Sequence, residues 1–474
     1  MAVSPAEELR SEVSVPVAIV GGGACGMVAA LAAQDAGVRP LILERDAVPS
    51  GSTALSSGLI PAPGTRFQRE FGVEDDPACF VADIMHKNDN GSDPAVTRRL
   101  AEEIGPILEW LADNHGLPFE LVTGFLYPGH SRMRMHALPS RNGRELIDRL
   151  ATAVTEREID LITEAHVVEL FADSNGWVTG LTIQRPDGSR DNLGCDALIL
   201  ACNGYGGNQD LVRRYIPQMA DALYFGHPGN TGDAILWGQR LGAQLDDLGA
   251  YQGHGSVAHP QGILVTWALM MEGGIQVNLR GERFSNEHDG YSEQAERVLA
   301  QPEGTVWSIY DSRLHELGKQ FDDYRQAIAL GAIRRADDVE SLIRQTQLPA
   351  ETLARTIAEA RGLSLAGKTD NFGRTFTVET NLVPPYYAVR VTGALFHTQG
   401  GLAIDEEARV LRRAGGPLPN LFAAGGAARG VSGATVGGYL SGNGLLTAIG
   451  LGRIAGQSAA TLGSVGARAG ASEG

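Results

Sequence analysis

Three glycines near the N-terminus, Gly21, Gly23 and Gly26, have the spacing of a loop that binds a pyrophosphate. At the first position glycine permits a tight turn, at the second it lets the backbone approach the phosphates, and at the third it lets a helix pack closely on the preceding strand. Farther along the chain, Glu44 supplies a carboxylate of the kind that accepts hydrogen bonds from a ribose. These four residues together predict a dinucleotide-binding site.

The segments around these residues are those that such a site needs. Val17–Val20 is apolar and β-branched, as expected of a buried parallel strand. A helix from Ala24 to about Ala36 directs its positive N-terminal dipole at the phosphates, and a second strand, Pro40–Leu43, ends directly before Glu44. A glycine-rich turn of another α/β protein is the alternative, but this order of elements favours a Rossmann unit. The acid also favours a ribose without a phosphate, which disfavours NADP.

The composition excludes several classes of function. The chain has 474 residues, enough for two or three domains, and a net charge of −17, which disfavours nucleic acids and anionic membranes as partners. No run of roughly 18 apolar residues predicts a membrane span, and the acidic N-terminus differs from a secretion signal. The cysteines lack metal-ligand spacing, so we expect reduced thiols, no metal site and a cytoplasmic location. They are Cys25, Cys79, Cys195 and Cys202.

Other glycine-rich segments lie far from the N-terminal motif. Ser50–Thr65 is dense in serine, threonine and glycine, which can place hydrogen-bond donors along a pyrophosphate or a flavin ring. Ala197–Gly207 is an apolar strand that ends in glycines, as where a chain returns to a bound cofactor. Near the C-terminus, Leu418–Gly426 leads into Gly433–Gly444 and a helical stretch. The two ends of the chain are therefore predicted to build one site.

These segments, in this order, resemble the flavoprotein family that contains the flavoprotein subunits of fumarate reductase and succinate dehydrogenase and the 3-ketosteroid dehydrogenases. The resemblance extends from Val15 to about Gly456. It implies FAD, held non-covalently because Ser52 and Thr53 stand where covalent members have a histidine. It implies these cofactor-binding residues: Gly21, Gly23, Ala24, Gly26, Glu44, Arg45, Ser52, Thr53, Ser57, Gly58, Val167, Asn203, Gly426, Gly442, Asn443 and Leu445.

The same resemblance implies an α/β fold in two parts. A discontinuous, Rossmann-like FAD-binding domain would comprise residues 1–254 and 378–474. An inserted α+β capping domain, residues 255–377, would close over the flavin. The composition of the middle of the chain gives weak support to this division, because a charged, helix-like stretch such as Asp337–Arg361 lies between the glycine-rich ends.

The chain departs from the family pattern where fumarate reductases bind their substrate. Relatives place one arginine in an Asn-Arg-Leu-Gly-Gly-Asn turn before the last helix, and alignment of Gly442-Asn443 puts Tyr439 at that arginine's position. Asn286–Ala295 likewise lacks the arginine that relatives use for proton delivery. Because guanidinium groups match carboxylates bidentately, the site for a dicarboxylate is predicted to be incomplete.

A phenol at this position favours a ketone. Tyrosine can donate a hydrogen bond to a ketone oxygen and stabilise an enolate, or act as a base if its pKa is lowered. The turn Gly438–Gly442, which contains Tyr439 and Ser441, resembles that of ketosteroid dehydrogenases. We therefore expect a desaturase in which Tyr439 and Ser441 polarise the carbonyl while Tyr291 or Tyr310 removes the α proton and the β hydrogen leaves as hydride to FAD. For each cap tyrosine, ordinary packing is the alternative.

Three further features have two interpretations each. His397, in His-Thr-Gln-Gly-Gly, matches a substrate-site histidine of fumarate reductases, but it can equally support the turn. Arg313 is near the expected position of the proton-donating arginine, and an ordinary solvated side chain is the alternative. Tyr127–Arg141, rich in histidine and arginine, is either a wall of the substrate channel or a surface loop.

The leading prediction is an FAD-dependent dehydrogenase of CH–CH groups that desaturates the bond next to a carbonyl. The alternative is a fumarate-reductase-like enzyme that reduces unsaturated mono- or dicarboxylates. A non-enzymatic flavin-binding protein is a third class, which the water-excluding cap disfavours. The expected partners are a small-molecule ketone or enoic acid and a separate electron acceptor, because the sequence has no CxxCH haem site or iron–sulfur cysteine pattern.

Overall fold

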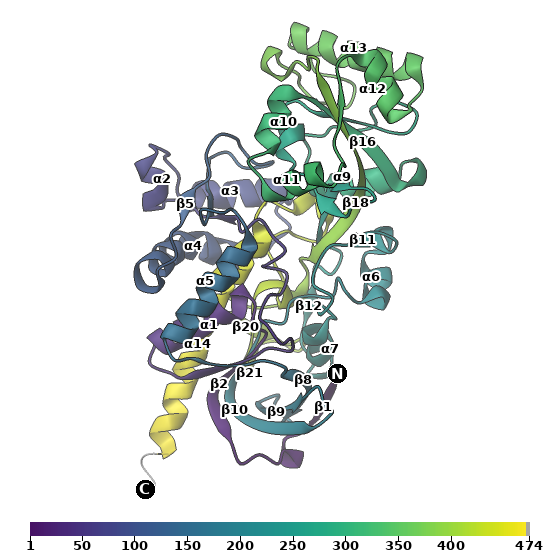
Figure 1. Ribbon diagram of the computed structural model, residues 1–474. Helices are drawn as coiled ribbons and strands as arrows, with labels where there is room; N and C mark the ends of the chain where they lie inside the picture. Colours follow the sequence, from purple (N-terminus) through teal and green to yellow (C-terminus); the bar gives the residue numbers. More distant parts are fainter. Residues whose placement is uncertain (471–474) are drawn as a thin grey trace.

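The computed structural model describes the backbone of residues 1–470 and the side chains of residues 1–462. Two β-sheets organise this part of the chain, and they lie toward opposite ends of an elongated molecule (Figure 1). Each sheet has its own apolar core. The architecture confirms the predicted α/β fold with a FAD-binding type of sheet and a second, capping sheet.

The first sheet has a parallel centre. Its strand order is β1-β8-β9-β10-β2-β3-β7, with β21 added beside β10 and β20 beside β21. The order β21-β10-β2-β3-β7 is parallel throughout, as in a Rossmann unit. The strands are β1 (Ala2–Pro5), β2 (Ser14–Val20), β3 (Pro40–Leu43), β7 (Asp160–Ile162), β8 (His166–Ala172), β9 (Val178–Gln184), β10 (Arg190–Leu200), β20 (Arg409–Leu411) and β21 (Pro417–Ala423).

Helices from both ends of the chain cover this sheet. The C-terminal helix α14 packs along the first helix α1 (Figure 1). Small residues permit this contact: a Cβ atom at Gly452 would lie 2.7 Å from the carbonyl oxygen of Cys25. The two ends of the chain therefore form one layer. The helices in this part are α1 (Ala24–Asp35), α2 (Arg66–Glu70), α3 (Pro77–Lys87), α4 (Pro94–His115), α5 (Gly143–Glu156), α6 (Gln209–Tyr215), α7 (Asp233–Arg240) and α14 (Asn443–Gly470).

The second sheet is built around one long strand, β18. Its order is β14-β13-β18-β16-β15, and β11 and β17 also pair with β18. The strands are β11 (Leu223–Tyr224), β13 (Tyr251–Ala258), β14 (Ile263–Leu264), β15 (Ile275–Val277), β16 (Thr305–Asp311), β17 (Arg334–Ala336) and β18 (Tyr386–Thr398). The helices are α8 (Ala268–Met271), α9 (Tyr291–Leu299), α10 (Ser312–Gly318), α11 (Asp322–Ala329), α12 (Val339–Thr346) and α13 (Ala350–Ala366).

The strand pairing extends the second sheet beyond the predicted cap, residues 255–377. β13 begins before residue 255, and β18 lies entirely after residue 377. β18 pairs with β16 from Tyr386 to Thr392 and with β13 as far as Thr398. Both sequence segments predicted for the FAD-binding domain thus contribute strands to the capping sheet.

Two small sheets complete the fold. One consists of β4 (Ile60–Pro61), β6 (Met135–Ala137) and β5 (Glu120–Leu121), and the other pairs β12 (Leu245–Asp246) with β19 (Gly401–Leu402). β6 lies within the sequence segment Tyr127–Arg141. Within the described residues, every helix is too short or too polar to cross a bilayer.

Candidate active site

A cavity of about 430 Å³ is lined by residues from both sheets. One end is formed by the loop between β2 and α1, the end of β3 and the loop after β10. The other end is formed by aromatic residues of β13, α9 and β18 and by the turn before α14. We refer to these as the dinucleotide end and the aromatic end.

At the dinucleotide end, the glycine loop leaves the start of α1 open. Gly21 has a φ of +112°, and a Cβ atom there would lie 2.5 Å from the carbonyl oxygen of Ala201. Gly23 is the N-cap of α1 and has no side chain to accept hydrogen bonds; the backbone N–H of Ala24 makes one long hydrogen bond, of 3.4 Å, to Thr53 Oγ1. A Cβ atom at Gly23 would have nothing within 4 Å. The N-terminus of α1, with this one long side-chain contact, therefore lies beside open space, which suits phosphate oxygens.

The predicted ribose acceptor lies beside this loop. Glu44 follows β3, is 6% exposed and lines the cavity. Its carboxylate accepts hydrogen bonds from the backbone N–H of Gly22 at 2.7 Å and of Asp46 at 2.9 Å. These two contacts fix its orientation, and a carboxylate retains further lone pairs for ribose hydroxyls.

The aromatic end brings two tyrosines together from distant elements. Tyr291 is the first residue of α9, and Tyr439 follows the short 3₁₀ turn before α14. Their rings meet edge to face with centroids 6.0 Å apart. His254 of β13 stacks between Tyr291, at 4.8 Å, and Phe396, at 5.4 Å. Trp267 contacts both His254 and Tyr291 edge to face. These packed rings hold both phenols in fixed orientations.

The hydroxyl groups of Tyr291, Tyr439 and Ser441 lie together at the aromatic end. Burial raises the pKa of Tyr291 to about 12, and hydrogen bonding to Ser441 and Tyr439 offsets part of that increase. Burial and the neighbouring Tyr291 hold the pKa of Tyr439 well above its usual range, although backbone groups of Gly444 and Gly442 act in the opposite direction. Both phenols are therefore neutral hydrogen-bond donors near pH 7.

Two histidines beside the phenols are uncharged. Burial lowers the pKa of His254 to about 3 and that of His397 to about 4. The backbone N–H of Ser256 donates to Nδ1 of His254 at 3.2 Å, so the ring proton of the neutral form is on Nε2. His397 lies against Gly444, its ring centroid 5.8 Å from that of Tyr439. The histidines therefore add polarity but no positive charge.

Comparison with known proteins agrees with this geometry. Residues 16–445 match the family model described as an FAD binding domain. The probable fumarate reductase Ifc3 of Shewanella frigidimarina (strain NCIMB 400) is 31% identical over 448 residues, which cover 94% of this chain and 74% of that protein. The chain belongs to the FAD-dependent fumarate reductase family of flavoproteins. The resemblance noted in the sequence is thus confirmed.

Other relatives of this flavoprotein differ in what their names say they act on. The urocanate reductase of Eggerthella lenta is 27% identical over 431 residues, covering 87% of this chain and 69% of that protein. A flavocytochrome c3 fumarate reductase in an open conformation superposes with a TM-score of 0.81 at 30% identity, covering 97% of this chain and 80% of that one. A 3-ketosteroid-Δ4-(5α)-dehydrogenase from Rhodococcus jostii RHA1 has the same fold, with a TM-score of 0.78 at 24% identity, covering 97% and 100%.

This flavoprotein is an FAD-dependent oxidoreductase of carbon–carbon double bonds or CH–CH groups. The dinucleotide end fits the cofactor: the N-terminus of α1 and open space suit the pyrophosphate, and Glu44 suits a ribose. Most predicted cofactor residues line the cavity, and their contact with FAD stays a prediction. They are Gly21, Gly23, Ala24, Glu44, Arg45, Ser52, Thr53, Ser57, Val167, Asn203, Gly426, Gly442 and Leu445.

Three predicted cofactor residues lie behind the cavity wall. Gly26 packs against the backbone of Gly21, which is the close helix contact expected of the third glycine. Gly58 has a φ of +67° and packs on Asn142. Asn443 is fully buried; its amide donates to Ser432 Oγ at 3.0 Å, and its Oδ1 has no hydrogen-bond partner. None of the three lines the cavity, and their contact with FAD stays a prediction.

The structure separates the predicted catalytic residues into two groups. Tyr439, Ser441, Tyr291 and His397 line the cavity, whereas Tyr310 and Arg313 do not. The Tyr310 hydroxyl forms a hydrogen bond with the Tyr324 hydroxyl at 2.7 Å inside the core of the second sheet. The exposed guanidinium of Arg313 donates to the carbonyl oxygen of Glu272 at 2.6 Å. Both side chains thus form their contacts within the cap. Of the two candidate bases, Tyr291 lines the cavity and Tyr310 does not.

Sequence reasoning missed residues of the cavity wall. His254 and Trp267 gave no recognised signal, because β13 and the segment after it show no motif of their own. Tyr127 lies within the segment for which a channel wall was one interpretation, and it lines the cavity. Burial raises the pKa of the Tyr127 phenol above its usual range, and so does its neighbour Tyr291. Tyr127, Met135 and Arg141 of this segment line the cavity, and a wall of the substrate channel stays a prediction for them.

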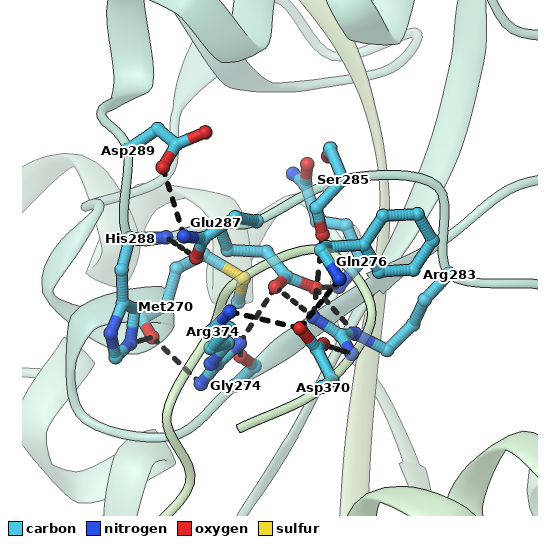
Figure 2. Close-up of polar contacts among 12 residues, drawn as sticks. Met270, Gly274, Gln276, Arg283, Ser285, Glu287, His288, Asp289, Asp370 and Arg374 are labelled. Carbon is cyan, nitrogen blue, oxygen red and sulfur yellow. Dashed lines mark hydrogen bonds and ion pairs between the residues drawn. The ribbon is translucent and has the colours of Figure 1, made fainter.

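A buried ionic network supports the loop before Tyr291 (Figure 2). The Glu287 carboxylate accepts hydrogen bonds from Arg283 at 2.6 and 3.0 Å, from Arg374 at 2.9 Å and from the backbone N–H of Gln276 at 3.0 Å. Burial alone would raise the pKa of Glu287, but Arg374 and Arg283 outweigh it and hold the pKa at about 2. Glu287 is thus an anion that binds two cations.

The same network reaches the cavity wall and the segment before β18. Arg283 also pairs with Asp370 (Figure 2). The backbone carbonyl of Glu287 accepts a hydrogen bond from the indole N–H of Trp267 at 3.2 Å. Removing one partner of a buried ion pair costs about 3–5 kcal/mol. The network therefore holds Trp267 and the start of α9 in one position.

Charged residues of the cavity are unevenly placed. Asp322 and Asp323, at the start of α11, line the cavity beside the cap, and Asp322 pairs with Arg325. Burial raises the pKa of Asp323 above its usual range. The lining arginines are Arg45, which donates to the carbonyl oxygen of Gly229 at 2.7 Å, and Arg141, whose charge lowers the pKa of Tyr127. In residues 1–462, no cluster of histidine, cysteine and carboxylate side chains could bind a metal ion.

Proposed function

We propose that this flavoprotein desaturates the carbon–carbon bond next to a ring ketone, so that a conjugated enone forms. One observation carries the proposal: Tyr291, Tyr439 and Ser441 converge at the aromatic end of the cavity. They occupy the two regions in which the family resemblance led us to expect arginines. Phenols and hydroxyls bind a carbonyl oxygen, whereas a dicarboxylate needs guanidinium groups.

Tyr439 and Ser441 would polarise the ketone. Their hydroxyls can donate to its oxygen, on which negative charge develops as the α proton leaves. The N-terminus of α14, which begins two residues after Ser441, adds a positive dipole end that favours the same charge. Because both side chains are nearly fully buried, water competes little for these hydrogen bonds.

Tyr291 would be the base. The Tyr291 phenol is neutral near pH 7, so the small fraction present as phenolate would take the proton from the α carbon. The electron pair of that C–H bond becomes the new carbon–carbon π bond as the hydrogen on the β carbon leaves with its electrons. Bound FAD would supply the hydride acceptor, so the substrate would be oxidised by two electrons. Tyr291 then returns its proton to solvent.

The charges of the cavity support a neutral substrate. Asp323 repels carboxylates at the cap side, whereas Asp322 is paired with Arg325, and the histidines beside the phenols are uncharged. Arg45 is engaged with a backbone carbonyl at the dinucleotide end. A diacid would therefore find one free guanidinium, that of Arg141, among the described residues of the wall.

Reduction of fumarate-like acids is the second candidate. It is favoured by the 31% identity to a probable fumarate reductase and by His397, which lines the cavity. In either direction the electrons would pass to or from a separate partner, because this sequence has no CxxCH haem site or iron–sulfur cysteine pattern. A cytoplasmic location also stays a prediction.

Anaerobic titration of the purified yellow protein distinguishes the two candidates. Cyclohexanone and 5α-androstane-3,17-dione serve as one-ring and four-ring ketones, and fumarate and urocanate serve as acids. Bleaching of the oxidised flavin by a ketone, with an enone as product, supports the proposal. Rapid reoxidation of the reduced protein by fumarate, with no bleaching by either ketone, refutes it.

A further inference from the structure

His130 connects the catalytic turn to the segment Tyr127–Arg141. Its Nε2 lies 2.9 Å from the backbone carbonyl oxygen of Ser441. A carbonyl oxygen only accepts hydrogen bonds, so Nε2 carries the proton. The side chain is 7% exposed, and the contact joins residues 311 positions apart in the chain. The turn before α14 therefore has a side-chain support from this segment.

Arg134 favours the same tautomer of His130, with the proton on Nε2. Its guanidinium lies 3.4 Å from Nδ1 of His130 and can only donate, so Nδ1 must accept. Burial and then the Arg134 charge lower the pKa of His130 to about 4, which leaves the ring neutral. Arg134 is itself 1% exposed, and its guanidinium binds Asp75 at 2.9 and 3.0 Å and also pairs with Asp83. The positive charge of Arg134 is thus balanced by two carboxylates, which also hold its guanidinium in place.

Packing supports the same contact. The His130 ring stacks on the Phe80 ring, with the two centroids 6.2 Å apart. The Arg134 guanidinium also packs on Phe80, 4.8 Å from the centre of its ring. Gly129 has a φ of +82°, and a Cβ atom there would lie 2.6 Å from Leu440. Leu440 is the residue between Tyr439 and Ser441. The loop thus touches the turn by one hydrogen bond and one close apolar contact.

We infer that His130 is a positioning residue, whose hydrogen bond to the Ser441 carbonyl fixes the turn that presents the Tyr439 and Ser441 hydroxyls. It does not touch the reacting atoms. Its effect on turnover rests on the proposed function, but its effect on the turn does not. Without the donor, the Ser441 carbonyl is buried without this partner, and the peptide that carries it gains freedom to rotate.

Amide hydrogen exchange of FAD-loaded protein tests the effect on the turn. His130→Phe keeps a ring against Phe80 and removes the donor. The control is His136→Phe: His136 is fully buried in the same segment, and it bonds Thr65 and the Arg134 carbonyl but not the turn. We expect residues 436–445 to exchange at least about tenfold faster in H130F and unchanged in H136F. Unchanged exchange in H130F, or equal acceleration in both, overturns the inference.

Kinetics test the consequence for catalysis. With a ketone that the wild type oxidises, H130F should lower kcat at least about tenfold with little change in KM, and His130→Gln should recover much of it. The Gln amide nitrogen can occupy the place of Nε2. A loss that H130Q fails to recover, or a change in KM alone, contradicts positioning.

The two proposals fail separately. If no ketone is oxidised by the wild type, the proposed function fails, while hydrogen exchange still decides the role of His130. If H130F does not load FAD, His130→Asn replaces it, because asparagine is polar but too short to reach the Ser441 carbonyl. The same comparison with H136F then applies.

Discussion

The rings of Tyr291 and Tyr439 meet edge to face with their centroids 6.0 Å apart, although 148 positions separate them in the chain. One begins a helix of the cap, and the other precedes the C-terminal helix that covers the FAD-binding sheet. Tyr439 nevertheless packs in the apolar core of the capping sheet. The contact therefore joins the two parts of the protein at the cavity.

Replacement of Tyr439 by Phe tests the role of its hydroxyl. Tyr439→Phe keeps the ring contacts and removes the donor, so we expect kcat for a ketone to fall about 10²–10³-fold, as for other lost oxyanion donors. A dye-linked assay measures turnover, and absorbance measures retained FAD. Tyr310→Phe is the matched control, because Tyr310 is buried in the cap but away from the cavity. Unchanged turnover in Tyr439→Phe would remove the proposed role.

The pH dependence of activity reports the base. Since burial raises the pKa of Tyr291 to about 12, the phenolate fraction rises tenfold per pH unit below that value. We expect log kcat/KM to increase with a slope near one from about pH 7 to 10. Tyr291→Phe should abolish both the slope and most of the activity. A profile that is flat, or that falls as pH rises, is incompatible with this base.

The charge of Asp323 should influence which substrates enter. Asp323→Asn removes a negative charge from the cavity wall, so KM for a ketone that carries a carboxylate should fall about three- to tenfold, while KM for a neutral ketone stays constant. Asp322→Asn serves as the control, since Arg325 already neutralises Asp322. An equal change for charged and neutral ketones would show that the effect is not electrostatic.

Acid should destabilise the protein through its buried histidines. The pKa of His254 is about 3 and that of His397 about 4, compared with about 6.5 in an unfolded chain. Between these values the unfolded state binds more protons, so stability is lost as pH falls below 6.5, by at most about 1.4 kcal/mol per pH unit for each histidine. Urea unfolding of His254→Phe should show a pH slope smaller by one proton. An unchanged slope would mean that His254 is not a neutral buried group.

The dinucleotide end could be predicted because its requirements are local. Gly21 and Gly23 act within one turn, and β2, α1 and β3 are consecutive in the chain. The glycine spacing, the apolar strands and the terminal acid Glu44 are therefore sufficient to predict a Rossmann unit. Tyr439 could be assigned to the site because it stands at a fixed distance from the Gly442-Asn443 pair that precedes α14.

The aromatic end depends on contacts that no local pattern encodes. All residues of β16 are buried, so strand alternation could not show that Tyr310 points into the cap core. Its partner Tyr324 comes from a later helix. Tyr127 reaches the cavity from the loop between β5 and β6, and His254 reaches it from β13, so only the tertiary fold brings them together.

The long strand β18 limits how this enzyme can be re-engineered. Its first residues pair within the cap, and its last, which include His397, reach the cavity. A graft of residues 255–377 onto a relative would separate these residues from their own central strand, β18, and from the first half of β13. Exchange of substrate preference between relatives must therefore transplant residues 251–398 as one unit, and the backbone crossings at both of its ends become the junctions to optimise.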